Sequence, residues 1–267
     1  MSWPDYNAYQ EAMQRPDLFL TDEALKHGRV QLNGDLPISW SGGFAYVFRI
    51  SARDGRDWAV RCFRSASAER RERHKAISTY LRSVQHVPTV GSHYLARGVR
   101  INNEVFPCVK MEWVDGVTLD KYIEHKLGEQ DVLSNVVAQW VELMSALRSA
   151  GIAHGDLHPG NVLVRNGQLV LIDYDGMYVP SLRGKCSEEC GLDNYQHPDR
   201  RAHPVYDAEM DYFSGWVIYG SLAALAIAPQ VWNKLNDGDD KKLLFDVRDF
   251  KNPHESRALR AMEALAH

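Results

Sequence analysis

Three polar side chains lie close together along the chain and have types that can do chemistry together. Asp156 and Asn161 precede one short apolar run, residues 162–164, and Asp173 ends the next apolar run. The segment between the two runs, residues 165–168, contains Asn-Gly, which tolerates the positive φ angles of a tight hairpin turn. This pattern predicts a hairpin that holds the two carboxylates and the amide near one another.

A carboxylate and an amide oxygen are ligands that suit a hard cation such as Mg²⁺. A second carboxylate beside them can accept a proton from a hydroxyl nucleophile. The same letters, taken as one short motif, also fit a polar loop between two buried strands. The register of Asp156, Asn161 and Asp173 favours a site over such a loop.

Composition narrows the class of protein. The chain has 267 residues, of which 45% are hydrophobic and 25% charged, so it can bury a large core as one big domain or two lobes. Its net charge of −4 gives no bulk attraction to nucleic acid. The first residues lack a basic segment followed by an apolar one, and the longest apolar run, residues 216–229, is too short to span a bilayer. Four cysteines without a paired metal-ligand pattern indicate a reducing cytoplasm.

The elements that must position these groups can be predicted from periodicity. Alternating apolar residues predict hairpins over residues 38–63 and 94–114. Apolar residues at helical spacing predict helices over residues 6–14, 67–83, 118–127, 131–150 and 207–226. Thr118 is the expected N-cap of the helix over 118–127. Gly151 is expected to end the helix over 131–150. The helix over 207–226 is apolar nearly all round and is expected to be buried, and residues 229–267 hold one or two short helices.

The stretch His154-Gly-Asp-Leu-His-Pro-Gly-Asn161 resembles the catalytic loop of the protein-kinase-like superfamily, written H-R-D-L-x-x-x-N. Asp173-Tyr-Asp-Gly176 resembles the D-F-G segment of the same superfamily. The resemblance implies that Asp156 is the catalytic base and that Asn161 and Asp173 hold Mg²⁺. It also places His158 among the catalytic residues.

The segment around residues 41–47 resembles the glycine-rich loop that covers the nucleotide phosphates in kinases. By this match the loop would contact ATP through Gly42, Gly43, Phe44, Ala45 and Val47, although Ala45 replaces the third glycine. Its glycines would let the backbone close over phosphates.

The next strand resembles the kinase pattern V-A-I-K, with Ala59 beside adenine. Arg61 stands where kinases carry a lysine, and a guanidinium can hold the α/β-phosphates by a fork. The helix over 67–83 would supply the glutamate that pairs with this cation, and Glu72 is the first choice and Glu69 the alternative. An equally open interpretation is that both belong to a solvated charge run.

The segment Met111-Glu-Trp-Val-Asp-Gly116 resembles the kinase hinge. Met111 would then be the gatekeeper, and the backbone of Glu112 and Val114 would bond the adenine edge. Leu163 completes the expected adenine site from the second lobe.

Two residues of the catalytic loop differ from the pattern of protein kinases. Gly155 replaces the arginine that binds a phosphorylated activation segment, and His158 replaces a lysine. With these two residues the loop is more similar to that of small-molecule phosphotransferases such as the aminoglycoside and choline kinases. Two later segments favour a protein substrate instead. Tyr195-Gln-His-Pro-Asp199 resembles the kinase A-P-E element, and Asp211-Tyr-Phe-Ser-Gly215 resembles the start of the kinase αF helix.

The resemblance, to a bacterial eukaryotic-like Ser/Thr protein kinase, implies an α+β, two-lobed fold. Residues 1–36 would be an extension packed on the N-lobe, residues 37–113 a β-rich N-lobe and residues 114–267 a helical C-lobe. The expected function is ATP- and Mg²⁺-dependent phosphoryl transfer to Ser or Thr of a protein in the cytoplasm, with no nucleic-acid or membrane partner and with room for a partner to dock on the C-lobe. A nucleotide-binding pseudokinase scaffold and a small-molecule phosphotransferase are the alternatives.

Overall fold

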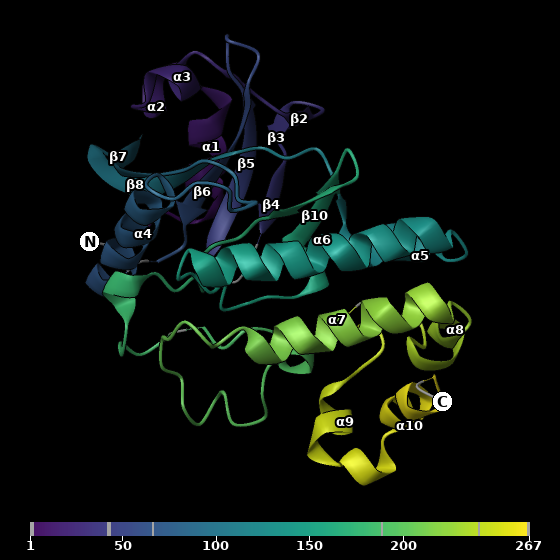
Figure 1. Ribbon diagram of the computed structural model, residues 1–267. Helices are drawn as coiled ribbons and strands as arrows, with labels where there is room; N and C mark the ends of the chain where they lie inside the picture. Colours follow the sequence, from purple (N-terminus) through teal and green to yellow (C-terminus); the bar gives the residue numbers. More distant parts are fainter. Residues whose placement is uncertain (1–2, 42–43, 66, 188, 240, 266–267) are drawn as a thin grey trace. The chain divides into compact units, whose positions relative to one another are not determined.

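The computed structural model describes residues 3–41, 44–65, 67–187, 189–239 and 241–265. The chain forms two compact units (Figure 1). The first contains residues 1–85 and 90–114, and the second contains residues 86–89 and 115–267. Within the described ranges, no helix is both long enough and apolar enough to cross a membrane.

The first unit is built on a six-stranded antiparallel sheet with the strand order β1-β5-β6-β8-β7, in which β4 also pairs with β5. Both predicted hairpins are confirmed, because β5 pairs with β6 and β7 pairs with β8. A separate small hairpin joins β2 to β3. The strands are β1 (Arg29–Val30), β2 (Leu32–Asn33), β3 (Leu36–Pro37), β4 (Ser39–Ser41), β5 (Ala45–Ser51), β6 (Asp57–Phe63), β7 (Ser92–Ile101) and β8 (Glu104–Glu112).

Three helices at the start of the chain pack on one face of this sheet. The predicted first helix is confirmed as α1 (Tyr6–Gln14), and α2 (Pro16–Phe19) and α3 (Glu23–Lys26) follow it. Tyr9 is fully buried in a cluster with Phe48 and Val60, and its hydroxyl donates to the Phe63 carbonyl at 2.9 Å. The N-terminal helices are therefore part of the hydrophobic core of the first unit.

Helix α4 (Ala68–Leu81) lies against the other face of the sheet, and it confirms the helix predicted over 67–83. Ser67 caps it by accepting a hydrogen bond from the Arg70 N–H at 3.0 Å. The ring of His74 packs on Phe63, with centroids 4.9 Å apart. Since side chains alternate along a strand, Arg61 points to the same face as Phe63 and hence to the α4 side.

The second unit combines a three-stranded sheet, order β11-β10-β9, with helices that include α5 (Leu119–Lys126) and α6 (Gln130–Ser149). The predicted turn at residues 165–168 is confirmed, because β10 (Val162–Arg165) pairs with β11 (Gln168–Leu171), and Asn166 and Gly167 both have positive φ. The third strand is β9 (Val117–Thr118). Gly151 ends α6 at a φ of 64°, as expected, whereas Thr118 precedes α5 without a side-chain capping bond.

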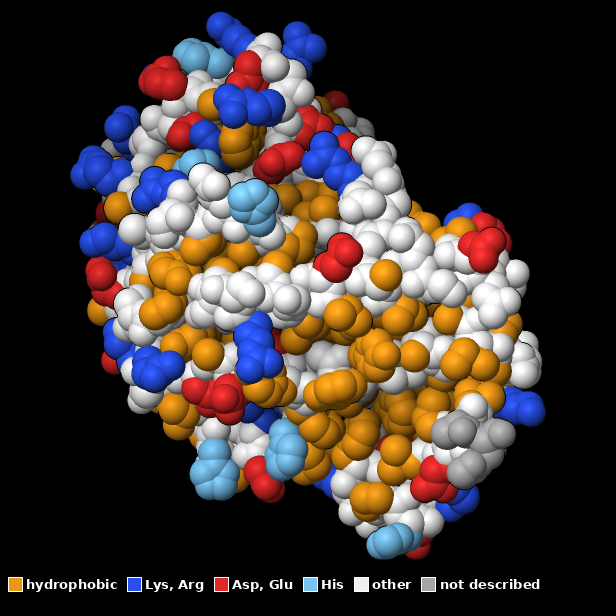
Figure 2. Space-filling view, in the orientation of Figure 1, with side chains coloured by type: hydrophobic (Ala, Val, Ile, Leu, Met, Phe, Trp, Pro, Cys, Tyr) orange, Lys and Arg blue, Asp and Glu red, His pale blue; other side chains and the backbone are white. Residues whose placement is uncertain are grey.

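Helices α6 and α7 (Tyr212–Ile227) lie side by side (Figure 1). The Trp140 indole N–H donates to the Gly215 carbonyl at 3.0 Å and fastens the pair. Helix α7 begins at Tyr212, five residues later than predicted, and it is not buried all round, because Trp216 is 71% exposed and Ile227 67% exposed. Figure 2 shows hydrophobic side chains gathered on the surface of these helices.

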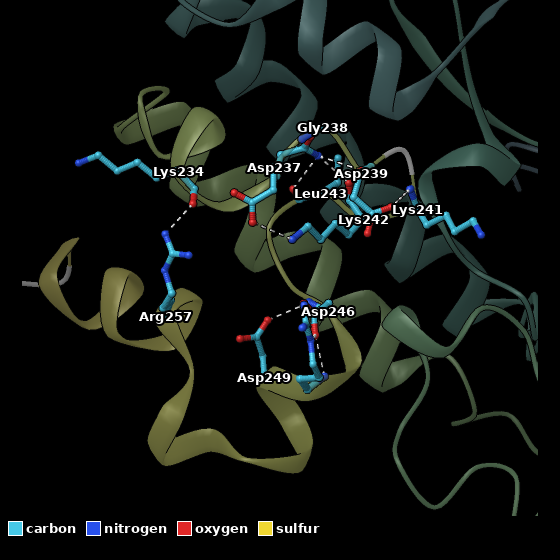
Figure 3. A network of polar contacts seen from close by, with 12 residues as sticks. Lys234, Asp237, Gly238, Asp239, Lys241, Lys242, Leu243, Asp246, Asp249 and Arg257 are labelled. Carbon is cyan, nitrogen blue, oxygen red and sulfur yellow. Dashed lines mark hydrogen bonds and ion pairs between the residues drawn. The ribbon is translucent and has the colours of Figure 1, made fainter.

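The end of the chain holds more helix than the sequence predicts. Three short helices follow α7 within the described residues, where one or two were expected: α8 (Val231–Leu235), α9 (Val247–Lys251) and α10 (Arg257–Leu265). Between α8 and α9, a network of polar contacts holds the loop (Figure 3), and Leu243, Leu244 and Phe245 in the same loop are buried. In it, Lys242 Nζ lies 3.6 Å from Asp237 Oδ2, and the Asn236 amide donates to the Lys242 carbonyl at 2.9 Å.

One buried ion pair fastens the N-terminal helices to the sheet of the first unit. Lys110 Nζ lies 2.8 and 2.9 Å from the two carboxylate oxygens of Asp22, and 4.5 Å from the centroid of the Trp58 ring. The Lys110 side chain is 11% exposed. Asp22 also caps α3 by accepting from the Leu25 N–H.

Replacing Asp22→Asn is expected to lower the free energy of unfolding by about 2–4 kcal/mol, because it leaves a buried ammonium without its counter-charge. Asparagine retains the capping ability, so the loss reports on the ion pair. Urea denaturation measures it. The matched control is Asp17→Asn at the exposed Arg15–Asp17 pair, where about 0–1 kcal/mol is expected. Equal losses in the two variants would contradict the role given to Lys110 and Asp22.

Candidate functional site

The β10–β11 hairpin sets the backbone of the predicted site in the second unit. The Asn161 N–H donates to the His158 carbonyl at 2.9 Å, and the Ile172 N–H donates to the Asn161 carbonyl at 3.0 Å. Residue 173 therefore follows directly beside Asn161. Asp156 joins them, because the Asn161 amide donates to its carbonyl oxygen at 2.9 Å and to its Oδ2 at 3.3 Å.

The orientation of Asn161 suits a cation. Because its Nδ2 donates to Asp156, its side-chain oxygen is directed away from that carboxylate, and an amide oxygen can ligate a cation. An amide oxygen together with the Asp173 carboxylate is a donor set that fits Mg²⁺, which completes its shell with water and phosphate oxygens. No group of three or more His, Cys, Asp or Glu side chains gathers at metal-binding distance in the described part of the chain.

Asp173 has an unusual backbone. Its φ is 62°, in the left-handed region that few residues other than glycine adopt, and its Oδ1 accepts from the Asp175 N–H at 3.4 Å. Such outliers concentrate at functional sites, where the surrounding contacts hold them. One of these contacts is the next residue, Tyr174, which is buried and donates its hydroxyl to the Leu171 carbonyl at 2.8 Å.

A buried carboxylate that precedes α7 holds the start of the catalytic loop. Asp211 accepts hydrogen bonds from the backbone N–H groups of His154 and of Gly155, the latter at 2.8 Å. Burial raises the pKa of the Asp211 carboxyl, and His154 together with the two N–H donors opposes that rise. The sequence placed Asp211 within the helix predicted over 207–226 and gave no sign of this contact, whereas in the structure it directly precedes α7.

The departure at Gly155 has a steric cause. Its φ is 80°, and a Cβ added to it would overlap the Gly176 carbonyl oxygen and come within 2.6 Å of Met210 Cε. No side chain, and therefore no arginine, fits at this position while the backbone of residue 176 packs there.

His158 is oriented by the loop itself. Its Nδ1 accepts from the Gly160 N–H at 3.1 Å, so the neutral ring carries its proton on Nε2, which lies 3.8 Å from Asp156 Oδ2. Burial lowers the pKa of His158, and the neighbouring Asp156 carboxylate opposes this shift only in part. The ring therefore favours its neutral form and turns an N–H toward the predicted base.

A distant segment also contacts the predicted base. Asp156 Oδ1 accepts from the Leu192 N–H at 3.1 Å, and the Asp156 side chain is 27% exposed. The segment is anchored by Tyr195, whose hydroxyl accepts from the Leu243 N–H at 2.9 Å, within the polar loop of Figure 3. Leu192 was missed by sequence reasoning, since nothing local in the chain connects it with Asp156.

The first unit holds the other predicted ligand contacts. Arg61 is buried between Val47 of β5 and Val109 of β8, its register partners. Ala45 lies on β5, and Ala59 lies on β6 together with Arg61. The ring of Phe44 lies under the Arg70 guanidinium, 4.3 Å from its centroid. The predicted contacts Gly42 and Gly43 lie outside the described residues.

The prediction that Glu72 pairs with Arg61 is wrong. The Glu72 side chain is 71% exposed and lies 4.0 Å from Lys75, one turn along the same helix, and Glu69 is exposed too. The face of α4 that packs on the sheet carries Arg73 and His74 instead. The run of charges from residue 69 to 73 misled the assignment, because helical phase, and not charge, decides which residue faces inward.

The predicted hinge continues from β8. Met111 is buried opposite Ala59, as a gatekeeper would be. The Glu112 N–H donates to the Gly91 carbonyl at 3.0 Å, and the Trp113 N–H donates to the Asp57 carbonyl at 2.9 Å. Both N–H groups are thus used within the unit, and Val114 follows with its side chain buried. Leu163, in the second unit, is buried on β10 opposite Thr118.

Replacing Gly155→Ala is expected to destabilise the protein by at least about 2 kcal/mol more than Gly167→Ala. Both glycines have positive φ, so both variants bear the cost of about 1–2 kcal/mol for an L-residue there. Only at Gly155 does the new methyl group meet backbone, whereas nothing lies within 4 Å of a Cβ at Gly167. Thermal denaturation of the two variants makes the comparison, and similar midpoints would show that the loop can move aside.

Comparisons with known proteins identify the family of the chain. A family model described as "Protein kinase domain" matches residues 41–261. The chain is similar to Serine/threonine-protein kinase 1 of Heliothis zea nuclear polyhedrosis virus, with 28% identity over 132 residues, or 49% of this chain and 47% of the relative. It is also similar to Serine/threonine-protein kinase chk1 of Schizosaccharomyces pombe, with 32% identity over 139 residues, or 49% of this chain and 27% of the relative. The chain thus spans less than half of each relative's length. Because the family model covers most of its residues, the chain belongs to the protein kinase domain family and has that family's α+β fold.

Proposed function

We propose that the protein is a kinase that uses ATP and Mg²⁺ to phosphorylate Ser or Thr hydroxyls of a protein substrate. The observation that carries this proposal is the arrangement of Asp156, Asn161 and residue 173 around one hairpin, in a chain of the protein kinase domain family. Two curated Ser/Thr protein kinases similar to half of the chain support the choice of acceptor. The four cysteines are all free thiols, which supports a reducing compartment such as the cytoplasm.

Asp156 is the group that orients the acceptor hydroxyl and takes its proton. Its carboxylate is fixed on three sides, by the Asn161 amide, the Leu192 N–H and the His158 ring, and it remains partly accessible. A base held in one orientation suits phosphoryl transfer, in which positioning supplies most of the catalysis.

Asn161 and Asp173 are the residues that would hold Mg²⁺. Bound there, the ion would offset the negative charge of the nucleotide phosphates. In the first unit, Arg61 would hold the α/β-phosphates from the face of β6 that lies toward α4. Ala59 and Met111, paired across β6 and β8, would meet the adenine ring.

A nucleotide-binding scaffold without transfer activity is the second candidate. The observation that favours it is the first unit's charge pattern, because Arg61 replaces a lysine and Glu72 points away from it. A kinase aligns its nucleotide with a Lys–Glu pair, so this unit must use other contacts or align the phosphates poorly.

Nucleotide binding and transfer can be separated in one experiment. Thermal shift with ATP, with and without Mg²⁺, reports binding, and radiolabelled ATP with a mixture of Ser- and Thr-containing peptides reports transfer. Asp173→Asn is expected to abolish the Mg²⁺-dependent part of the shift. Asp156→Ala is expected to retain the shift and to lower turnover by roughly 10²–10⁴-fold.

The exposed Asp131→Asn on α6 is the matched control and should behave as wild type. Undiminished transfer by Asp156→Ala would rule out the proposed base, and an unchanged Mg²⁺-dependent shift in Asp173→Asn would rule out the proposed metal ligand. A Mg²⁺-dependent shift in the wild type without transfer would select the scaffold.

Arg61→Ala is expected to weaken ATP by roughly 10- to 150-fold while leaving adenosine nearly unaffected, because only ATP carries the phosphates that a charge-assisted contact would hold. Titration calorimetry with both ligands measures this, with the exposed Arg100→Ala on β7 as control. Arg61→Lys adds a second comparison. Lower activity would mean that the site is shaped around guanidinium, and higher activity would mean that arginine impairs an ordinary kinase site. Equal loss of ATP and adenosine binding in Arg61→Ala would assign the residue to the fold.

A further inference from the structure

Gln196 carries a buried hydrogen-bond donor that the proposed mechanism does not yet use. The residue is 5% exposed, and its Nε2 meets no hydrogen-bond acceptor among the residues that the structure describes. Leaving a buried amide donor unpaired costs about 1–3 kcal/mol. Such a group in a folded protein needs an explanation, and one explanation is a ligand that supplies the acceptor.

The unpaired donor lies beside the proposed base. A Cβ built on Gly191 would come within 2.5 Å of Gln196 Nε2 and within 2.8 Å of Asp156 Oδ1, so both atoms flank the same backbone atom. Gly191 has a φ of 70°, and these two side chains occupy the space that its own side chain would need. No hydrogen bond joins the Gln196 Nε2 group to the carboxylate, and a ligand could bridge the two by accepting from the amide and donating to the carboxylate.

The segment that carries these residues also covers the base. The Leu192 N–H donates to Asp156 Oδ1, and the Asn161 amide and the His158 ring approach Oδ2. A carboxylate oxygen can accept more than one hydrogen bond, so an acceptor hydroxyl can donate to Oδ1 beside the Leu192 N–H. Gly191 lies against the buried amide of Gln196, so a ligand reaches that amide only when residues 191–192 move aside.

We propose that Gln196 binds the acceptor polypeptide, by donating from Nε2 to a main-chain carbonyl oxygen next to the residue that is phosphorylated. The hydroxyl oxygen needs its lone pair for attack on phosphorus, so a carbonyl is the better partner for the amide. Asp156 takes the hydroxyl and Gln196 the carbonyl, which gives a two-point contact that a peptide can make and a simple alcohol cannot. This inference rests on the proposed function, and it makes Gln196 a residue that selects peptide acceptors.

The test compares Gln196→Met with Gln139→Met. Methionine has a similar length and lacks the donor in both cases. The Gln139 amide is satisfied, because it donates to the Gly167 carbonyl at 2.8 Å and accepts from the Leu169 N–H at 3.1 Å. Gln139→Met should therefore lower the melting temperature by a few degrees and leave catalysis unchanged.

Gln196→Met should show the opposite pattern. Its melting temperature should stay the same or rise, because an unpaired buried donor is removed. Its kcat/KM for a Ser-containing peptide library should fall roughly 3- to 10-fold, the range of one neutral hydrogen bond. Its KM for ATP and its slow hydrolysis of ATP in the absence of peptide should match the wild type, because water offers no carbonyl.

Each other result has a defined meaning. A lower melting temperature in Gln196→Met would show a structural role and overturn the proposal. An unchanged kcat/KM for peptides, or an equal fall in peptide transfer and ATP hydrolysis, would overturn it as well while leaving the kinase function standing. A wild-type protein that neither phosphorylates peptides nor hydrolyses ATP would refute the proposed function, and this inference with it.

Discussion

The arrangement of the second unit depends on one buried carboxylate. Asp211 receives the backbone N–H groups of His154 and Gly155, which are two consecutive donors at a turn with positive φ. Those donors would otherwise be buried without partners. The same carboxylate precedes α7, which Trp140 fastens to α6. These contacts join residues 154–155 to α6 and α7. The backbone immediately before Asp156 is therefore held in place.

The residues at which the catalytic loop differs from the family pattern, Gly155 and His158, lie on either side of Asp156. Gly155 carries no side chain because the Gly176 carbonyl occupies its space. His158 is neutral and presents an N–H toward Asp156, where protein kinases have a lysine cation. The Leu192 N–H supplies another neutral donor to the same carboxylate. The carboxylate of Asp156, the proposed base, is thus oriented by neutral hydrogen-bond donors.

In the first unit, helices cover both faces of the six-stranded sheet. The N-terminal helices bury one face through Tyr9 and Met13, with Lys110 and Asp22 fixing their position. Helix α4 covers the other face and turns Arg73 and His74 inward. Arg73 and His74 are therefore buried on the side of α4 that packs on the sheet, whereas Glu69 and Glu72 of the same helix are exposed.

Interactions between residues close together in the sequence determine several helices and hairpins of this protein. Alternation and helical spacing were enough to predict both hairpins of the first unit and helices α1, α4, α5 and α6, and Asn166-Gly167 was enough to place Asn161 beside residue 173. These features depend on neighbours within a few residues, which a sequence displays directly. Contacts between distant segments could not be read in this way. Only the tertiary structure decided that Glu72 faces water, that Asp211 holds the loop, and that Gly191, Leu192 and Gln196 surround Asp156, because burial and hydrogen bonding depend on which surfaces pack together.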